Sequence, residues 1–272
     1  MAVNLRNSII SSLNTGLRQS ISGGPGKAWT PARLSGLRLW LDADDDTTIT
    51  LSGNKITEWN DKSGNGNNAS QGDGSNEPTY NTATINSKNV VNFGSDKFMT
   101  TTYPPALNRT IGTVVRYNSI NGLRVVMGAR ESNNERSYLG INNGNVRIGV
   151  GDKSTLSGNS VSVSVTYTQI LKHGDETGSK KTSHYLNGTE DIINQDFGGD
   201  IGSGQNYMIG GFNDAGSVHN STYDGLMGEI VITDNVMSDS DRQKLEGYLA
   251  HKWGHAASLP TDHPYKSSAP TV

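Results

Sequence analysis

Apolar and polar residues alternate in short runs along most of the chain, from residue 29 to residue 236. Leucines occupy every second position of residues 37–42, and valines followed by a tyrosine do the same in residues 160–171. A period of two is typical of a strand with one buried face. The pattern predicts strands at residues 37–42, 55–60, 89–93, 97–101, 110–117, 122–129, 136–142, 145–150, 160–171, 182–187, 190–193, 206–211 and 225–233.

Turn-forming residues separate these runs. Asn143-Gly144 and Asn187-Gly188 are typical two-residue hairpin turns, because both residue types tolerate a positive φ. The Ser-Gly-Asn-Gly-Asn sequence of residues 63–67 indicates a longer loop. Many short strands at near-regular spacing predict a mainly β protein, either a sandwich or a barrel of antiparallel strands.

One strong helix is expected inside this domain, at residues 238–253. Ser238, followed three residues later by Asp241, resembles a capping box in which aspartate replaces the usual glutamate. Gly254 suits a C-terminal cap. The apolar stripe of this helix, expected to pack on the edge of the sandwich, consists of Leu245, Tyr248, Leu249 and Trp253.

Residues 1–28 differ from the rest and are predicted to form a helical anchor with a Gly/Pro linker, ahead of a domain of residues 29–272. The helix carries one thin apolar stripe with mostly four-residue steps: Leu5, Ile9, Ile10, Leu13, Leu17 and Ile21. Such a helix is not stable alone in water, because nucleation is costly. We expect it to contact a partner, either two further copies in a homotrimer or a socket on a virion. A leader without function is the alternative.

The composition narrows the class of protein. Hydrophobic residues make up 32% of the 272 residues and 33 are glycine, which suits strands joined by tight turns rather than a helical bundle. The net charge of −3 and the lack of a basic run argue against a nucleic-acid partner. No apolar stretch reaches ~18 residues and no secretion signal is recognised, so we expect no membrane partner and synthesis in the host cytoplasm. Without cysteine, disulfides and thiolate metal sites are excluded.

Several short motifs occur in a characteristic order. They are Leu-Trp-Leu-Asp-Ala-Asp at 39–44, Trp-Asn-Asp-Lys-Ser-Gly-Asn-Gly-Asn at 59–67, Val-Val-Asn-Phe at 90–93, Tyr-Leu-Asn-Gly-Thr at 185–189, the segment 223–230 and the ending 248–265. Over about residues 37–266 the chain thereby resembles the concanavalin A-like, laminin-G-like domains of bacteriophage and bacterial surface proteins. The resemblance implies a jelly-roll sandwich of two antiparallel sheets. It leaves the ligand open, because this fold hosts lectins, glycosidases, adhesins and structural modules.

A glycosidase of this fold would place carboxylates at alternating positions of one strand, so that they share a face about 5–5.5 Å apart. The best counterpart is residues 229–233, Glu-Ile-Val-Ile-Thr, in which Val231 and Thr233 occupy the other two positions. Because the carboxylate pair is missing, we expect no enzymatic activity and no catalytic residue. Glu229 is expected to pair with a neighbour in a structural role.

Aspartates gather after the first strand and in the following loop. Asp44, Asp46 and Asp61 supply the hard oxygen atoms that Ca²⁺ prefers. Their spacing does not match the helix-loop-helix calcium loop. Aspartate and asparagine also dominate turns, where they hydrogen-bond nearby backbone. We expect turn chemistry, no metal site and no cofactor, with Ca²⁺ as the alternative.

The aromatic residues are divided between core and loops. Trp40, Trp59 and Trp253 are predicted to be packing residues. Tyrosines at 80, 103, 207 and 223 are nearer loops, as is the Gly-Gly-Phe-Asn-Asp run of 210–214. Sugars stack on aromatic faces, and polar loop groups bind their hydroxyls. If a glycan binds, the expected contacts are Tyr103, Phe212, Asn213 and Asp214.

Two functions from different classes follow from these observations. The first is a bacteriophage virion structural protein, a tail, fibre or capsid-decoration component, whose lectin-like sandwich adheres to host-surface glycans. The second is a free, lectin-like glycan-binding module. The missing secretion signal favours the virion, because virions assemble in the cytoplasm, and glycosidase activity comes third.

Overall fold

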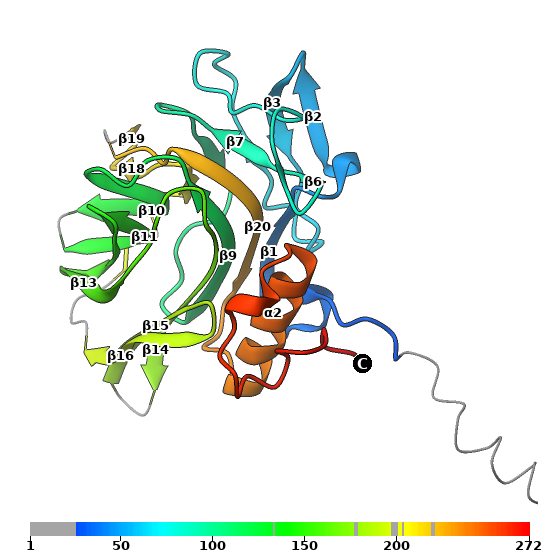
Figure 1. Ribbon diagram of the computed structural model, residues 1–272. Helices are drawn as coiled ribbons and strands as arrows, with labels where there is room; N and C mark the ends of the chain where they lie inside the picture. Colours follow the sequence, from blue (N-terminus) through cyan, green and yellow to red (C-terminus); the bar gives the residue numbers. More distant parts are fainter. Residues whose placement is uncertain (1–25, 133, 177–178, 197–200, 203, 219–220) are drawn as a thin grey trace, which may run out of the picture.

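The computed structural model describes residues 26–272 except 133, 177–178, 197–200, 203 and 219–220. Two large antiparallel sheets form a sandwich, which confirms the predicted fold class (Figure 1). The first sheet has the order β1 (Leu37–Asp42), β20 (Gly225–Thr233), β9 (Arg109–Tyr117), β14 (Thr166–Glu176), β15 (Ser179–Leu186) and β16 (Thr189–Asp196), and β7 (Val91–Phe93) also pairs with β20.

The second sheet carries the remaining long hairpins. Its order is β13 (Lys153–Ser160), β12 (Asn145–Gly151), β11 (Glu135–Asn142), β10 (Leu123–Ser132), β17 (Met208–Ile209), β8 (Met99–Thr101), β4 (Ala69–Ser70), β3 (Lys55–Trp59) and β2 (Ile49–Ser52). A short hairpin of β18 (Asn213–Asp214) and β19 (Ser217–Val218) pairs with the end of β10, and β5 (Thr84–Ile85) pairs with β6 (Lys88–Asn89). Single 3-10 turns lie at Pro31–Arg33, Asp46–Thr48 and Ala256–Ser258.

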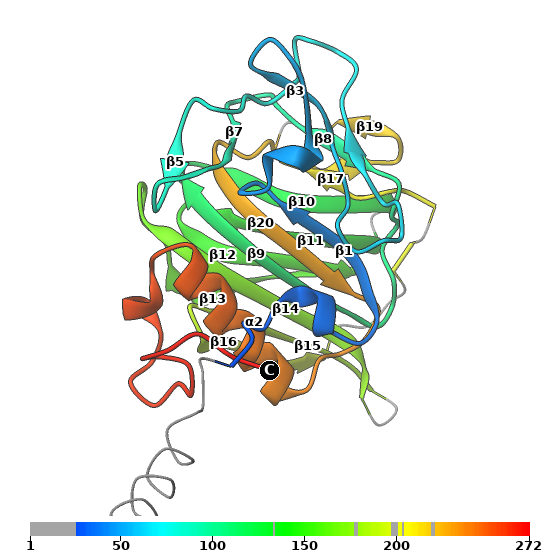
Figure 2. The same cartoon turned by 90° about the vertical axis from the view of Figure 1, so that its right-hand side faces the viewer.

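The helix α2 (Asp239–Lys252) covers the outer face of the first sheet (Figure 2). The Oγ of Ser238 accepts the backbone N–H of Asp241 at 3.1 Å, and Gly254 has a φ of +76° after the last turn, so both predicted caps are confirmed. The helix packs closely on the sheet at Gly112 of β9, because glycine has no side chain there. A Cβ at this position would be only 2.8 Å from Leu245. Residues at alternate positions of β9 therefore face the second sheet, on what we call the inner face.

One predicted strand is wrong in its first half. Residues 161–165 form a loop, and β14 begins only at Thr166. Val163 and Val165 are 46% and 42% exposed, and Ser164 between them has a φ of +62°, which a strand does not allow. Alternating valines suggested a buried face that the chain does not form. The preceding strand β13 was not predicted, because its sequence is polar and lacks that alternation.

The core contains more of the aromatic residues than expected. Trp40, Trp59 and Trp253 are buried, as predicted. Tyr80, Tyr207 and Tyr223, which the sequence places near loops, are at most 2% exposed. A buried tyrosine needs a hydrogen-bond partner for its hydroxyl. That of Tyr223, for example, lies 2.9 Å from the backbone carbonyls of Arg116 and Leu226 and donates to them.

The described residues reach into the predicted linker. The N–H of Trp29 donates to Pro270, and the N–H of Val272 donates to Lys27, so the last residues of the linker pair with the C-terminal tail. The proposed anchor residues at positions 5–21 lie outside the described residues. Among the residues described, no helix has the length and apolar character needed to cross a membrane.

Candidate functional site

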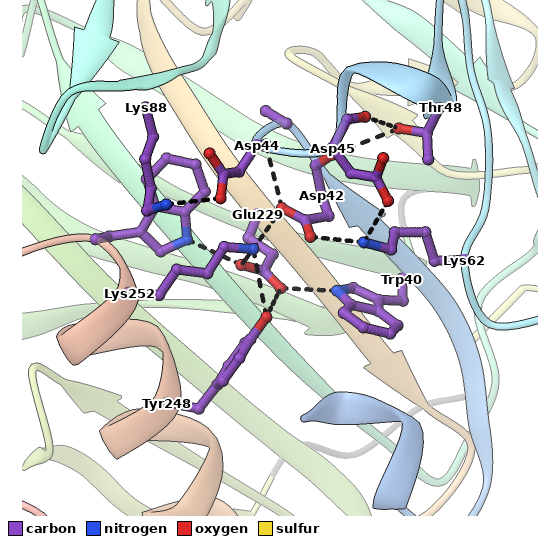
Figure 3. A network of polar contacts seen from close by, with 12 residues as sticks. Trp40, Asp42, Asp44, Asp45, Thr48, Lys62, Lys88, Glu229, Tyr248 and Lys252 are labelled. Carbon is purple, nitrogen blue, oxygen red and sulfur yellow. Dashed lines mark hydrogen bonds and ion pairs between the residues drawn. The ribbon is translucent and has the colours of Figure 1, made fainter. Parts of the chain in front are cut away.

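Aspartates at the end of β1 and directly after it take part in ion pairs on the outer face of the first sheet (Figure 3). Asp42 is 4% exposed and pairs with Lys62 at 2.9 Å and with Lys252 of α2. Lys62 also pairs with Asp45 at 2.7 Å, and this hydrogen bond holds the pKa of Asp45 below its ordinary value. Partial burial alone would lower the pKa of Lys62. Its hydrogen bonds to Asp45 and Asp42 outweigh this effect, so the pKa of Lys62 is raised.

The residues considered for Ca²⁺ are engaged in other ways. Asp44 pairs with Lys88 at 2.7 Å. The carboxylate of Asp61 accepts the backbone N–H groups of Trp40, Ser63 and Asn67 at 2.8–3.0 Å, which is the turn chemistry expected from the sequence. Asp46 is exposed. Within the part of the chain that the structure describes, no group of three or more His, Asp or Glu side chains is placed to hold a metal ion.

Glu229 is fully buried beneath α2, where it has four donors. Its Oε1 accepts from Trp40 Nε1 at 2.7 Å and from the Tyr248 hydroxyl at 3.0 Å. Its Oε2 accepts from Trp253 Nε1 at 2.9 Å and lies 2.9 Å from the Lys252 ammonium. Burial raises the pKa of this carboxyl. The contacts agree with the structural role expected for Glu229, since they join α2 to the sheet.

A second carboxylate does lie beside Glu229, although its own strand supplies none. Asp42 of β1 is directly opposite Glu229 in the antiparallel register of β1 and β20. The two side chains share the Lys252 ammonium. With exposed fractions of 4% and 0%, neither carboxylate is open to a substrate in this structure. Because neither carboxylate can contact a substrate, the pair is not placed for hydrolysis, whatever the distance between the two carboxylates.

A different group of side chains reaches the surface on the outer face of the second sheet. Arg130 of β10 forms a two-bond ion pair with Asp214 of β18, with Nε 2.7 Å from Oδ1. Their side chains are 22% and 25% exposed. The Arg130 guanidinium lies 5.4 Å from the centre of the Phe212 ring. We call Arg130, Asp214, Phe212, Tyr138 and Arg147 the Arg130–Asp214 face.

Aromatic rings form the base of this face. Phe212 packs edge-on against Tyr138 of β11, with ring centres 5.2 Å apart. Arg147 of β12 donates from Nε to the Tyr138 hydroxyl at 3.1 Å. The rings come close to the backbone of the sheet because Gly128 and Gly149 have no side chains, since a Cβ on either glycine would be within 2.5 Å of a ring atom. The neighbouring strands β10, β11 and β12 thus supply Arg130, Tyr138 and Arg147 to one surface of arginine and aromatic side chains.

The predicted glycan contacts divide between this face and the interior. Asp214 is at the surface, whereas Phe212 is only 4% exposed, so its ring is covered and does not offer a free face for a sugar. Asn213 is 7% exposed and builds the hairpin, because its side chain donates to Asn206 and accepts from Gly216. Tyr103 is partly buried and packs with Tyr207 against the main core, and burial raises its pKa to about 12.

Sequence reasoning missed Arg130, Tyr138 and Arg147. Tyr138 and Arg147 stand on predicted strands, and Arg130 comes directly after the predicted strand of residues 122–129. Each is two residues from a glycine or an arginine of the same face. The alternation is visible in the sequence, but it does not predict which face of the strand lies on the outside of the sandwich. That depends on the partner strands and on the side against which the first sheet packs.

Substitution of Gly149 by alanine is expected to destabilise this face. The new Cβ would lie 2.0 Å from the Tyr138 ring, so the ring must move. We expect a loss of about 1–3 kcal/mol of unfolding free energy, the usual cost of overpacking. Urea denaturation measures it, with Gly72→Ala as the control, since no atom lies within 4 Å of that position. Equal stability of the two variants would contradict the packing described.

Comparison with known proteins identifies the fold. No family model and no curated protein sequence matches the chain. A Trypanosoma rangeli sialidase in complex with 2,3-difluorosialic acid is similar in structure, with a TM-score of 0.58 and 14% identity, over 90% of this chain and 39% of that chain. Domain 4 of AbnA, an extracellular GH43 arabinanase from Geobacillus stearothermophilus in complex with arabinotriose, matches with a TM-score of 0.55 and 12% identity, over 77% of this chain and 98% of that one.

The two matches differ in what they cover. The chain spans less than two-fifths of the sialidase, but it accounts for nearly all of the arabinanase domain. At such low identity the likeness concerns the fold alone. It is consistent with a concanavalin A-like β-sandwich, the class that the sequence motifs imply.

Proposed function

We propose that the chain is a non-catalytic, glycan-binding β-sandwich module that binds through the Arg130–Asp214 face. The observation that carries this proposal is the Arg130–Asp214 ion pair, about one quarter exposed, above a packed aromatic base. The guanidinium offers planar donors and the carboxylate offers acceptors, which together complement neighbouring hydroxyls of a sugar. Rigid elements hold both groups, so little ordering is needed on binding.

Two further observations support this reading. The arabinanase domain, which the chain covers almost entirely, is in complex with arabinotriose, so a domain of this fold is compatible with a glycan ligand. The carboxylates nearest to a catalytic arrangement, Asp42 and Glu229, are buried and paired with lysines. Binding without hydrolysis therefore fits the described residues better than glycosidase activity.

The setting that we propose for this module is the bacteriophage virion. This part of the proposal rests on the sequence resemblance over about residues 37–266 and on the apolar stripe of residues 5–21. It includes self-association or contact with other virion proteins through that stripe. Deletion of residues 1–26 tests it: incorporation into particles should be lost while the sandwich still folds, and unchanged incorporation would contradict the anchor.

The glycan site is tested with two variants and a matched control. Asp214→Ala and Arg130→Ala are each expected to weaken glycan binding about 10- to 100-fold, because a charged hydrogen-bonding partner is lost. Arg38→Ala removes a similar ion pair, with Asp234, on the other sheet and should leave binding unchanged. A glycan array followed by calorimetry on the best ligand measures this.

The outcomes separate the alternatives. Undiminished binding by Asp214→Ala would place the glycan elsewhere, and an array without hits would leave only a structural role. Release of reducing sugar from the bound glycan, abolished in Glu229→Gln, would contradict the absence of catalysis. Thermal melts of all variants show whether any loss of binding is a loss of fold.

A further inference from the structure

Arg109 places a guanidinium in the interior of the sandwich. It begins β9 and is fully buried. In the register of β9 and β14 it lies directly opposite His173, so the two side chains are neighbours on the inner face. From the second sheet, Tyr207 approaches the same region, and its hydroxyl is 2.6 Å from Ser137 Oγ. The cluster therefore lies between the two sheets.

Several nitrogens in this cluster lack a partner. Arg109 Nη1 donates to the carbonyl of Ala106 at 2.7 Å, but Nε and Nη2 are buried without a partner of good hydrogen-bond geometry among the described residues, although the nearby Tyr207 hydroxyl helps to hold the Arg109 charge. His173 Nε2 also lacks a partner of good geometry, whereas the Nδ1 side of the ring is 2.6 Å from Thr182 Oγ1 and the Lys181 backbone acts on the ring as a further hydrogen-bond partner. Buried donors are normally satisfied, so this group requires an explanation.

The charge of Arg109 is also uncompensated. No carboxylate of the described residues forms an ion pair with it, and the polar side chains that act on its charge are the phenols of Tyr207 and Tyr103. Burial lowers the pKa of Arg109, but an arginine stays protonated in proteins. A water molecule would satisfy the hydrogen bonds without neutralising the charge. A buried cation without a counter-charge is strongly unfavourable, so an anion explains both observations together.

We propose that this cluster is an interior binding site for a small monovalent anion, either a halide or a carboxylate. Arg109 Nε and Nη2 and the Nε2 of His173 are its donors, with the hydroxyls of Tyr103 and Tyr207 close by. Burial and the Arg109 charge lower the pKa of His173 to about 2, so this ring is neutral and its Nε2 donates when it carries the proton.

The site lies just below the surface. Leu107, whose carbonyl is 3.5 Å from Arg109 Nη1, is 40% exposed, and Tyr103 is partly exposed. A small anion could therefore exchange with solvent through local motion of this loop. Tyr103 would then contribute to ligand binding at a site different from the surface expected from the sequence. The inference stands independently of the proposed glycan face.

Bromide and acetate distinguish the two classes of anion. The melting temperature of the full chain is measured while chloride, bromide or acetate is titrated at constant ionic strength. A binding anion should raise it by about 5–10 °C at a hundredfold excess over Kd and then saturate. Response to halides alone assigns a halide site, and response to acetate alone assigns a carboxylate site. No saturable response would overturn the proposal.

Two variants and one crystallographic measurement complete the test. Arg109→Met should abolish the saturable response, whereas Arg38→Met, at an exposed ion pair, should keep it. Because Arg109→Met could fail to fold, crystals of the unaltered protein grown with bromide are the second test. An anomalous peak within hydrogen-bonding distance of Arg109 Nη2 supports the site. A water, or a carboxylate of the protein itself, at this position would overturn it.

Discussion

Replacement of Lys252 by methionine is expected to lower the free energy of unfolding by about 3–5 kcal/mol, the usual cost of removing one partner from a buried ion pair. Lys252 is the only lysine that pairs with both Asp42 and Glu229 among the described residues. Methionine keeps the length and apolar stem of the side chain, so the loss reflects the missing charge. Glu229 would be left buried with no cation. Urea denaturation of the unaltered and variant proteins measures the difference.

Lys62→Met is the matched control. Lys62 also pairs with Asp42, but it is 22% exposed and Asp42 would retain Lys252. We expect a loss of about 1 kcal/mol or less, as for pairs near the surface. Equal costs at the two positions would show that α2 is not held to the sheet by the Glu229 network.

The cost of Lys252→Met should also depend on pH. Burial raises the pKa of Glu229 above its ordinary value of 4.5, so folding favours the protonated carboxyl. Stability from this group is complete below pH 4.5 and is lost as pH rises through the raised pKa. Without the lysine the penalty for the charged form increases. The difference between variant and unaltered protein should therefore be small near pH 4 and should grow toward pH 7.

Local sequence signals predicted those elements whose burial follows a simple period. Residues 37–42 were predicted as a strand and form β1 with these bounds, because leucines on alternate positions face the core. The helix was predicted from its apolar stripe, and its two caps from Ser238 with Asp241 and from Gly254. Alternation failed at Val163 and Val165, where the chain turns after a hairpin, since period alone does not tell a loop from a strand end.

The sites depend on pairing between distant strands, which no local pattern contains. The carboxylate beside Glu229 was sought at Val231 and Thr233 of the same strand, whereas it comes from β1 across the sheet. The loop before β18 was selected correctly as turn-like, but Phe212 points onto the sheet because Gly128 leaves room there. Turn composition gives the position of a loop; the neighbouring strands decide which of its side chains remain exposed.

Acidification from pH 7 to pH 4 is expected to destabilise the protein through His255. This residue follows α2, is 8% exposed, and its Nε2 is 2.8 Å from Thr168 Oγ1 on β14. Burial, with a smaller effect of the Arg116 charge, lowers its pKa to about 4 from an ordinary 6.5. The folded protein thus favours the neutral ring. Stability from His255 is complete above pH 6.5 and is lost as pH falls through 4.

A shift of this size corresponds to a loss of about 3 kcal/mol across that interval, at 1.36 kcal/mol for each unit of pKa. His255→Gln keeps a polar partner for Thr168 but does not titrate. Its unfolding free energy, measured in urea at pH 7, 6, 5 and 4, should therefore fall less steeply than that of the unaltered protein. The same substitution at His251, on the last turn of α2, is the control. If His255→Gln and His251→Gln showed the same pH dependence as the unaltered chain, His255 would not be the buried neutral group that the structure places between the end of α2 and β14.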